Sequence, residues 1–140
     1  MQMSGLWLCF PAIVLATLVM PLVDIAADSA KSIPVEVWSG SDDGVTLRLR
    51  DTLESALKSS TRFNLSFGKK PGTLVVDIPT HARWKQIGGR NRVFYSVEFS
   101  SGDQKLGADT GSCWDDEMPK CAARIVRNAQ RVVGKIHPPK

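Results

Sequence analysis

The chain has 140 residues, of which 18 are Lys or Arg and 14 are Asp or Glu, so its formal net charge is +4. Its first 30 residues resemble a leader, and the remaining 110 can form one small domain with a modest core, which excludes a multidomain organisation. The sequence shows no internal repeat and no low-complexity block, which excludes a repeat array and a largely disordered chain.

The N-terminal segment has the pattern of a secretory signal peptide. Residues 6–23 carry no charge, and small residues of the kind that signal peptidase accepts follow them. The run also approaches the length of a membrane span, although Pro11 and Pro21 are unfavourable in a spanning helix. We expect residues 1–30 to be a signal peptide, with an uncleaved N-terminal anchor as the alternative. The protein is then periplasmic or secreted.

Export raises the net charge of the folded part. Asp24 and Asp28 leave with the leader, so 18 basic and 12 acidic residues remain, a net charge of +6. A basic exported domain favours anionic partners such as envelope polymers or acidic protein faces, although the same charge also serves solubility alone.

The mature chain opens with a strand and a helix. "IPVEVW" at 33–38 predicts a short strand, and "SGSDDG" ends it with Asp42 or Asp43 as the N-cap of a helix over 44–59. The apolar residues of this helix recur at helical spacing, at Val45, Leu49, Leu53, Ala56 and Leu57.

Two further strands follow the first helix. At 62–67 the residues Phe63, Leu65 and Phe67 alternate with polar neighbours, the pattern of a half-buried strand. A nearly continuous apolar run at 73–78 predicts the next strand.

The last part of the chain predicts a long strand over 92–101, a short strand near "KLGA", and a second helix over 119–136. The buried face of this helix is expected at Ala122, Ile125, Val126, Ala129, Val132, Val133 and Ile136. We therefore expect a single α+β domain over 31–136 and a disordered tail at 137–140. Its architecture is a two-layer sandwich, with a mostly antiparallel sheet of four to five strands and both helices on one face.

The tetrapeptide Asp109–Ser112 matches the motif that carries the catalytic carboxylate of aspartic proteases. Such an enzyme needs two carboxylates on braced loops of an all-β scaffold. This chain has one such motif, and only an acidic cap and a helix follow it. We interpret the motif as a chance match.

Cys113 and Cys121 enclose seven residues, a spacing that fits neither a CxxC redox motif nor paired zinc knuckles. In an exported chain they most simply form a disulfide, which would pin the last loop to the start of the second helix. His81 and His137 are too remote to suggest a zinc site, and we expect no metal and no cofactor.

The stretch "HARWKQIGGRNR" at 81–92 is the strongest candidate for a binding site. It places four basic residues around a tryptophan, with Gly88-Gly89 as a turn: Arg83, Trp84, Lys85, Arg90 and Arg92. Arginine and exposed tryptophan dominate binding energy at interfaces. The alternative is a long solvated hairpin whose Trp84 folds back over the sheet edge. A basic stripe on the second helix, Arg124, Arg127, Arg131 and Lys135, is a weaker candidate and is typical of a solvated face.

The segments "VWSGSDDGVTLRLRDTLESALKSSTRF", "GTLVVDI" and "TGSCWDDEMPKCAARIV" resemble a family of small exported proteobacterial proteins of unassigned function. The strand–helix–strand opening is similar in topology to envelope domains of Tol-system and penicillin-binding-protein activator lipoproteins. This resemblance implies a docking role in the cell envelope.

The function expected from the sequence is therefore that of an exported, non-enzymatic interaction or accessory domain of the envelope. A secreted inhibitor or immunity-type protein is one alternative, and a small periplasmic hydrolase is another. The expected partner is another envelope or secreted protein, or an anionic envelope polymer, and not nucleic acid. Membrane contact is expected only if the N-terminal segment is retained.

Overall fold

The computed structural model describes residues 31–68 and 70–136, so the expected leader and tail lie outside the described residues. The elements follow in the order β1 (Ile33–Ser39), α1 (Gly44–Lys58), β2 (Phe63–Leu65), β3 (Leu74–Ile78), β4 (Arg83–Ile87), β5 (Arg90–Ser101), β6 (Gln104–Trp114), a 3-10 turn η1 (Asp115–Glu117) and α2 (Met118–Ile136). Neither helix of this described part is long and apolar enough to cross a membrane.

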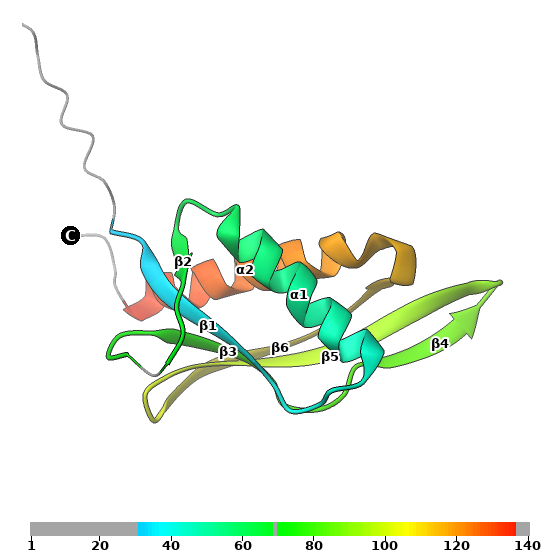
Figure 1. The fold of residues 1–140 in the computed structure, drawn as a ribbon, viewed down its shortest axis with the longest axis horizontal. Coiled ribbons are helices and arrows are strands. Elements are labelled where there is room, and N and C mark those ends of the chain that lie inside the picture. The colour runs from blue at the N-terminus through cyan, green and yellow to red at the C-terminus, as the bar shows by residue number, and fades with distance from the viewer. Residues whose placement is uncertain (1–30, 69, 137–140) are drawn as a thin grey trace, which may run out of the picture.

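The strands form one curled sheet, and both helices cover the same face of it (Figure 1). β1 lies between β2 and β3 and is parallel to both, whereas β5 is antiparallel to β3, β4 and β6. The predicted α+β class, with most strand pairs antiparallel and both helices on one face, is confirmed. The described sheet has six strands rather than four to five, because residues 83–87 pair with β5 as a separate strand.

The helices supply most of the core opposite the sheet. In α1 the predicted stripe is correct, with Leu49, Leu53 and Leu57 fully buried. In α2 the residues Ala122, Ile125 and Ala129 are fully buried as well. Burying a Leu or Ile side chain stabilises a fold by about 1.5–3 kcal/mol. These side chains therefore hold the two layers together.

β3 and β4 lie on the same edge of β5, and a short break separates them. Asp77 is opposite Glu98 and Arg83 is opposite Phe94, so five residues (78–82) stand against three (95–97). Pro79 lies in this break and cannot donate a backbone hydrogen bond to the sheet. Beyond the break, β4 and the first half of β5 form a hairpin that projects past the helices (Figure 1).

Two details of the strand prediction are wrong. The second strand ends at Leu65, and Phe67 is 78% exposed in the connection that follows. The region that begins at Gln104 is one 11-residue strand, β6, rather than a short strand and a loop, so Asp109–Ser112 lies within the sheet. Cross-strand pairing with β5 over nearly the whole length of β6 explains why these small polar residues adopt an extended conformation.

The predicted disulfide is present between Cys113 and Cys121, whose Cα atoms are 5.7 Å apart. It ties the end of strand β6, rather than a loop, to the first turn of α2. Closing a loop this short contributes about 2–3 kcal/mol to stability.

Candidate functional site

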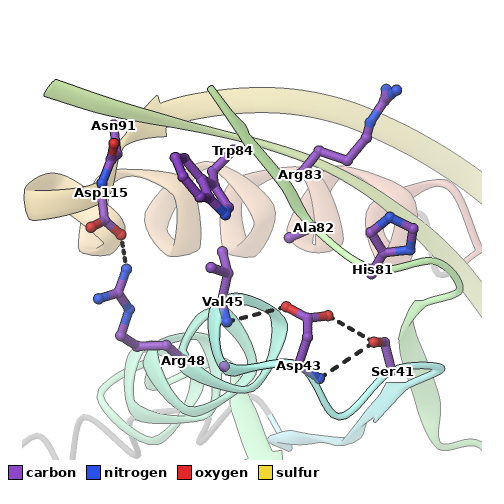
Figure 2. A pocket seen from close by; sticks show the side chains of 11 residues that line it. Ser41, Asp43, Val45, Arg48, His81, Ala82, Arg83, Trp84, Asn91 and Asp115 are labelled. Carbon is purple, nitrogen blue, oxygen red and sulfur yellow. Dashed lines mark hydrogen bonds and ion pairs between the residues drawn. The ribbon is translucent and has the colours of Figure 1, made fainter. Parts of the chain in front are cut away.

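A cavity of about 880 Å³ lies between the N-terminal end of α1 and the β4–β5 hairpin (Figure 2). Its walls come from the loop before α1, the first turns of α1, the break before β4, the hairpin and η1: Ser41, Asp43, Gly44, Val45, Arg48, His81, Ala82, Arg83, Trp84, Asn91 and Asp115. Helix, hairpin and 3-10 turn meet here although they are far apart in the sequence.

Asp43 lines the cavity and is the N-cap of α1. Its Oδ1 accepts hydrogen bonds from the backbone N–H groups of Val45 (3.2 Å) and Thr46 (3.0 Å), and its Oδ2 accepts from the hydroxyls of Thr46 (2.6 Å) and Ser41 (2.7 Å). These bonds, above all the one from the Thr46 side chain, lower the pKa of Asp43 to about 2. Both carboxylate oxygens are thus used to start the helix.

Thr46 connects this cap to the hairpin. It is fully buried, and its Oγ1 accepts a hydrogen bond of 2.7 Å from the backbone N–H of Ala82 while donating to Asp43. Ala82 immediately precedes β4. The N-terminal turn of α1 therefore fixes the point at which the hairpin leaves the sheet.

The cavity contains a serine, a histidine and an aspartate, but they are not connected as a catalytic triad. A triad requires the histidine to contact both the nucleophile and the carboxylate. Here Ser41 donates to Asp43, and within the described residues no hydrogen bond joins His81 to either of them. His81 is exposed at the mouth of the cavity.

The hairpin presents Trp84 to this cavity. The Trp84 ring extends from β4 toward Val45 of α1, whereas the Arg83 side chain points away from the cavity (Figure 2). Trp84 is 58% exposed, so it does not fold back over the sheet edge. Because side chains alternate along a strand, Lys85 lies on the same face of β4 as Arg83.

Two of the five predicted binding residues make contacts within the protein. The guanidinium carbons of Arg90 and Arg92 lie 4.4 Å and 5.0 Å from the centre of the Trp114 ring, a cation–π arrangement. Arg90 also binds Asp116 at 2.8 Å, and Arg92 donates to the hydroxyl of Ser112 at 3.1 Å. These contacts brace the end of the hairpin that is next to its turn against the end of β6. Arg83 and Lys85 are exposed on one face of β4, and Trp84 is exposed on the other.

The sequence did not reveal Trp114 or the Arg48–Asp115 ion pair, which closes the cavity at the η1 end (Figure 2). Both belong to contacts between distant segments. The one sequence signal for these contacts was "CWDDE", an aromatic and acidic stretch that follows directly on the disulfide-bonded Cys113.

The protease-like motif has a structural role. Asp109 accepts hydrogen bonds from Arg124 (3.2 Å) and from the side chain of Asn128 (2.5 Å), and Arg124 also donates to the carbonyl of Thr110. These groups dock α2 onto β6. One arginine of the basic stripe on α2 is thereby used in packing contacts. Within the described residues, no cluster of three or more His, Cys, Asp or Glu side chains is arranged to hold a metal ion.

No protein-family model and no curated protein matches this chain. Among solved structures, the chain is similar to the crystal structure of a minor lipoprotein from Acinetobacter baumannii, with a TM-score of 0.52 and 13% sequence identity. The match covers 71% of this chain and 92% of that one. The two proteins share a fold.

Proposed function

We propose that this chain is an exported, non-enzymatic accessory domain of the cell envelope, and that its β4–β5 hairpin and the adjoining cavity bind a partner protein. One observation carries the proposal: every residue of β4 is exposed, including Trp84 at 58%. A strand with both faces in solvent and a tryptophan beside a cavity is costly to leave uncovered unless a partner buries it.

The chemistry of the cavity favours binding over catalysis. The carboxyl of Asp43 is held ionised by the helix cap, because its lowered pKa and its four hydrogen bonds keep it from exchanging protons near neutral pH. The carboxylate of Asp115 is paired with Arg48. What remains accessible is an indole, an imidazole and basic side chains, which suit recognition.

An envelope location is supported by three observations. The N-terminal segment has the pattern of a secretory leader, and the disulfide fits an oxidising compartment. The structural neighbour is called a minor lipoprotein, which is in keeping with an envelope accessory protein.

The proposal is tested by partner capture from native envelope preparations. The triple variant Arg83→Ala, Trp84→Ala, Lys85→Ala should lose the partners recovered by crosslinking and mass spectrometry. Its melting temperature should stay within a few degrees of the wild type, because exposed substitutions usually change stability by less than about 0.5 kcal/mol.

The matched control replaces three exposed cations of α2, at Arg127, Arg131 and Lys135, with alanine. This control should capture the same partners as the wild type. Unchanged capture by the hairpin variant, or equal loss in both variants, would refute a specific role for the hairpin.

A further inference from the structure

We propose that the free edge of β4 binds an extended acidic segment of the partner protein as an additional strand, with an apolar side chain of that segment placed in the cavity beside Trp84. This inference rests on the proposed function and names the chemistry of its partner. It follows from the backbone, the side chains and the charge of the hairpin.

The backbone of β4 has unpaired groups on one edge. Gly88 and Gly89 form a two-residue turn with φ of +57° and +77°, so Ile87 and Arg90, which flank it, exchange both hydrogen bonds. By alternation, Arg83 and Lys85 also bond to β5. The N–H and C=O groups of Trp84 and Gln86 therefore point to the outer edge.

The neighbouring position on that edge supports this assignment. Ala82 is two residues before Trp84, so its N–H points to the same outer edge. There it donates to the Thr46 hydroxyl of α1 at 2.7 Å. Within the described residues, β4 makes no backbone hydrogen bond except to β5. Thr46 thus closes the edge at Ala82, and the edge stays open at Trp84 and Gln86. Exposed strand edges of this kind are templates for strand addition.

The side chains define what the added strand must look like. One face of β4 presents Trp84 to the cavity, and the other presents Arg83 and Lys85. A strand laid beside β4 alternates in the same way. Its residues on the cavity side should be apolar and fill space beside the indole, and those on the other side should be acidic.

The positive charge of the hairpin favours an acidic segment as the added strand. Residues 81–97 contain four Lys or Arg and no Asp or Glu. Within the described residues, Arg83 and Lys85 make no ion pair or side-chain hydrogen bond, unlike Arg90 and Arg92. The same charge opposes pairing of β4 with a second copy of itself, because like charges would lie side by side.

β4 differs from the other strands at the edges of the described sheet. β2 has only three residues, and neither β2 nor β6 contributes to the large cavity. The combination of open backbone, adjacent cavity and unpaired cations therefore occurs at β4.

The test measures binding of a fluorescein-labelled nonapeptide of alternating Glu and Val with a Gly at each end. The decisive variant is Gln86→Pro, which removes an outward N–H and leaves the hydrogen bonds to β5 in place, so proline is tolerated there. Gln86→Ala is its matched control, because alanine keeps the N–H. Proline should weaken peptide binding by at least about tenfold, and alanine by less than about twofold.

A charge exchange gives a second and independent readout. The double variant Arg83→Glu, Lys85→Glu should bind a nonapeptide with Lys in place of Glu and lose the acidic one. Circular dichroism and the melting temperature establish that each variant folds. Sedimentation velocity without peptide should show a monomer, and a dimer lost in Gln86→Pro would overturn the proposal in favour of a second copy as occupant.

Equal peptide binding by Gln86→Pro and the wild type would overturn strand addition. Equal binding of the acidic and basic peptides by the wild type would overturn the acidic occupant, and with it the proposal. If partner capture is nevertheless lost in the Trp84 triple variant, the proposed function stands and only this inference fails. If capture is unchanged there, the proposed function fails as well.

Discussion

Thr46→Val is the substitution that most sharply tests how the hairpin is positioned. Valine has nearly the same shape as threonine but removes the hydroxyl, which here accepts from the N–H of Ala82 and donates to the carboxylate of Asp43. Thr46 is fully buried and Ala82 is 4% exposed, so water cannot replace the lost bond without opening the site. The variant therefore leaves a buried N–H without a partner.

An unsatisfied buried donor costs about 1–3 kcal/mol, and the lost bond to a carboxylate adds a further fraction because Asp43 lies close to solvent. We expect Thr46→Val to lower the free energy of unfolding by about 2–4 kcal/mol. For a domain of this size that corresponds to a fall in melting temperature of roughly 10–20 °C. The valine methyl groups offset little, since the site is already filled.

Urea denaturation of wild type, Thr46→Val and Thr46→Ser measures the effect. Serine keeps the hydroxyl and loses one methyl group, so it should cost only about 1 kcal/mol. NMR titration should also show the pKa of Asp43 rising from about 2 toward 3.8 in the valine variant, since the Thr46 side chain is the main cause of its lowering. A valine variant within about 0.5 kcal/mol of the wild type, or an unchanged pKa, would refute the argument.

Three further outcomes are expected. Ellman titration of mature protein should find no thiol before reduction and two after it. Reduction should lower the free energy of unfolding by about 2–3 kcal/mol. Two thiols in natively exported protein before reduction would contradict the pairing. The lowered pKa of Asp43 contributes stability that is present above pH 3.8 and lost as the pH falls toward 2. Between these pH values the urea midpoint should therefore drop more steeply in the wild type than in Asp43→Asn. Parallel curves of urea midpoint against pH would exclude this contribution. Gly111→Ala should lower the stability by about 1–3 kcal/mol, because the added Cβ would lie 2.3 Å from the Tyr95 hydroxyl. Gly44→Ala is the control, because a Cβ at Gly44 would have no atom within 4 Å. Equal melting temperatures of the two variants would be inconsistent with this packing.

Most of the fold could be predicted from the sequence, because local patterns define the helices. The helical spacing of apolar residues in α1 and the cap at Asp43 are readable without any tertiary contact. The disulfide was also predictable, because a chain expected to be exported, with two cysteines outside its leader, leaves few alternatives.

β6 was not predictable from its own composition. "LGADTGS" is rich in small and polar residues that favour turns, yet it pairs with β5 along its length. Gly111 is needed there because the Tyr95 ring of β5 lies across it, a cross-strand contact that the sequence alone cannot show. Phe67 shows the opposite error, since its alternation with Phe63 predicted burial but the strand ends before it.

The candidate site was predicted in part. The segment 81–92 was singled out by its composition. The contacts of Arg90 and Arg92 could not be predicted, because both side chains lie over Trp114, which is distant in the sequence. The cavity depends on how α1 and η1 approach the hairpin, and this is a property of tertiary packing. Local patterns singled out the segment, and tertiary packing determines which of its side chains contact other parts of the protein.

The most direct test of the central claim is site-specific photocrosslinking in intact cells. A photoreactive amino acid replaces Lys85 on the exposed hairpin in one strain and Arg127 on the exposed face of α2 in another. A discrete crosslinked partner is expected from position 85 and none from position 127. No adduct at 85, or the same adducts from both positions, would contradict that claim.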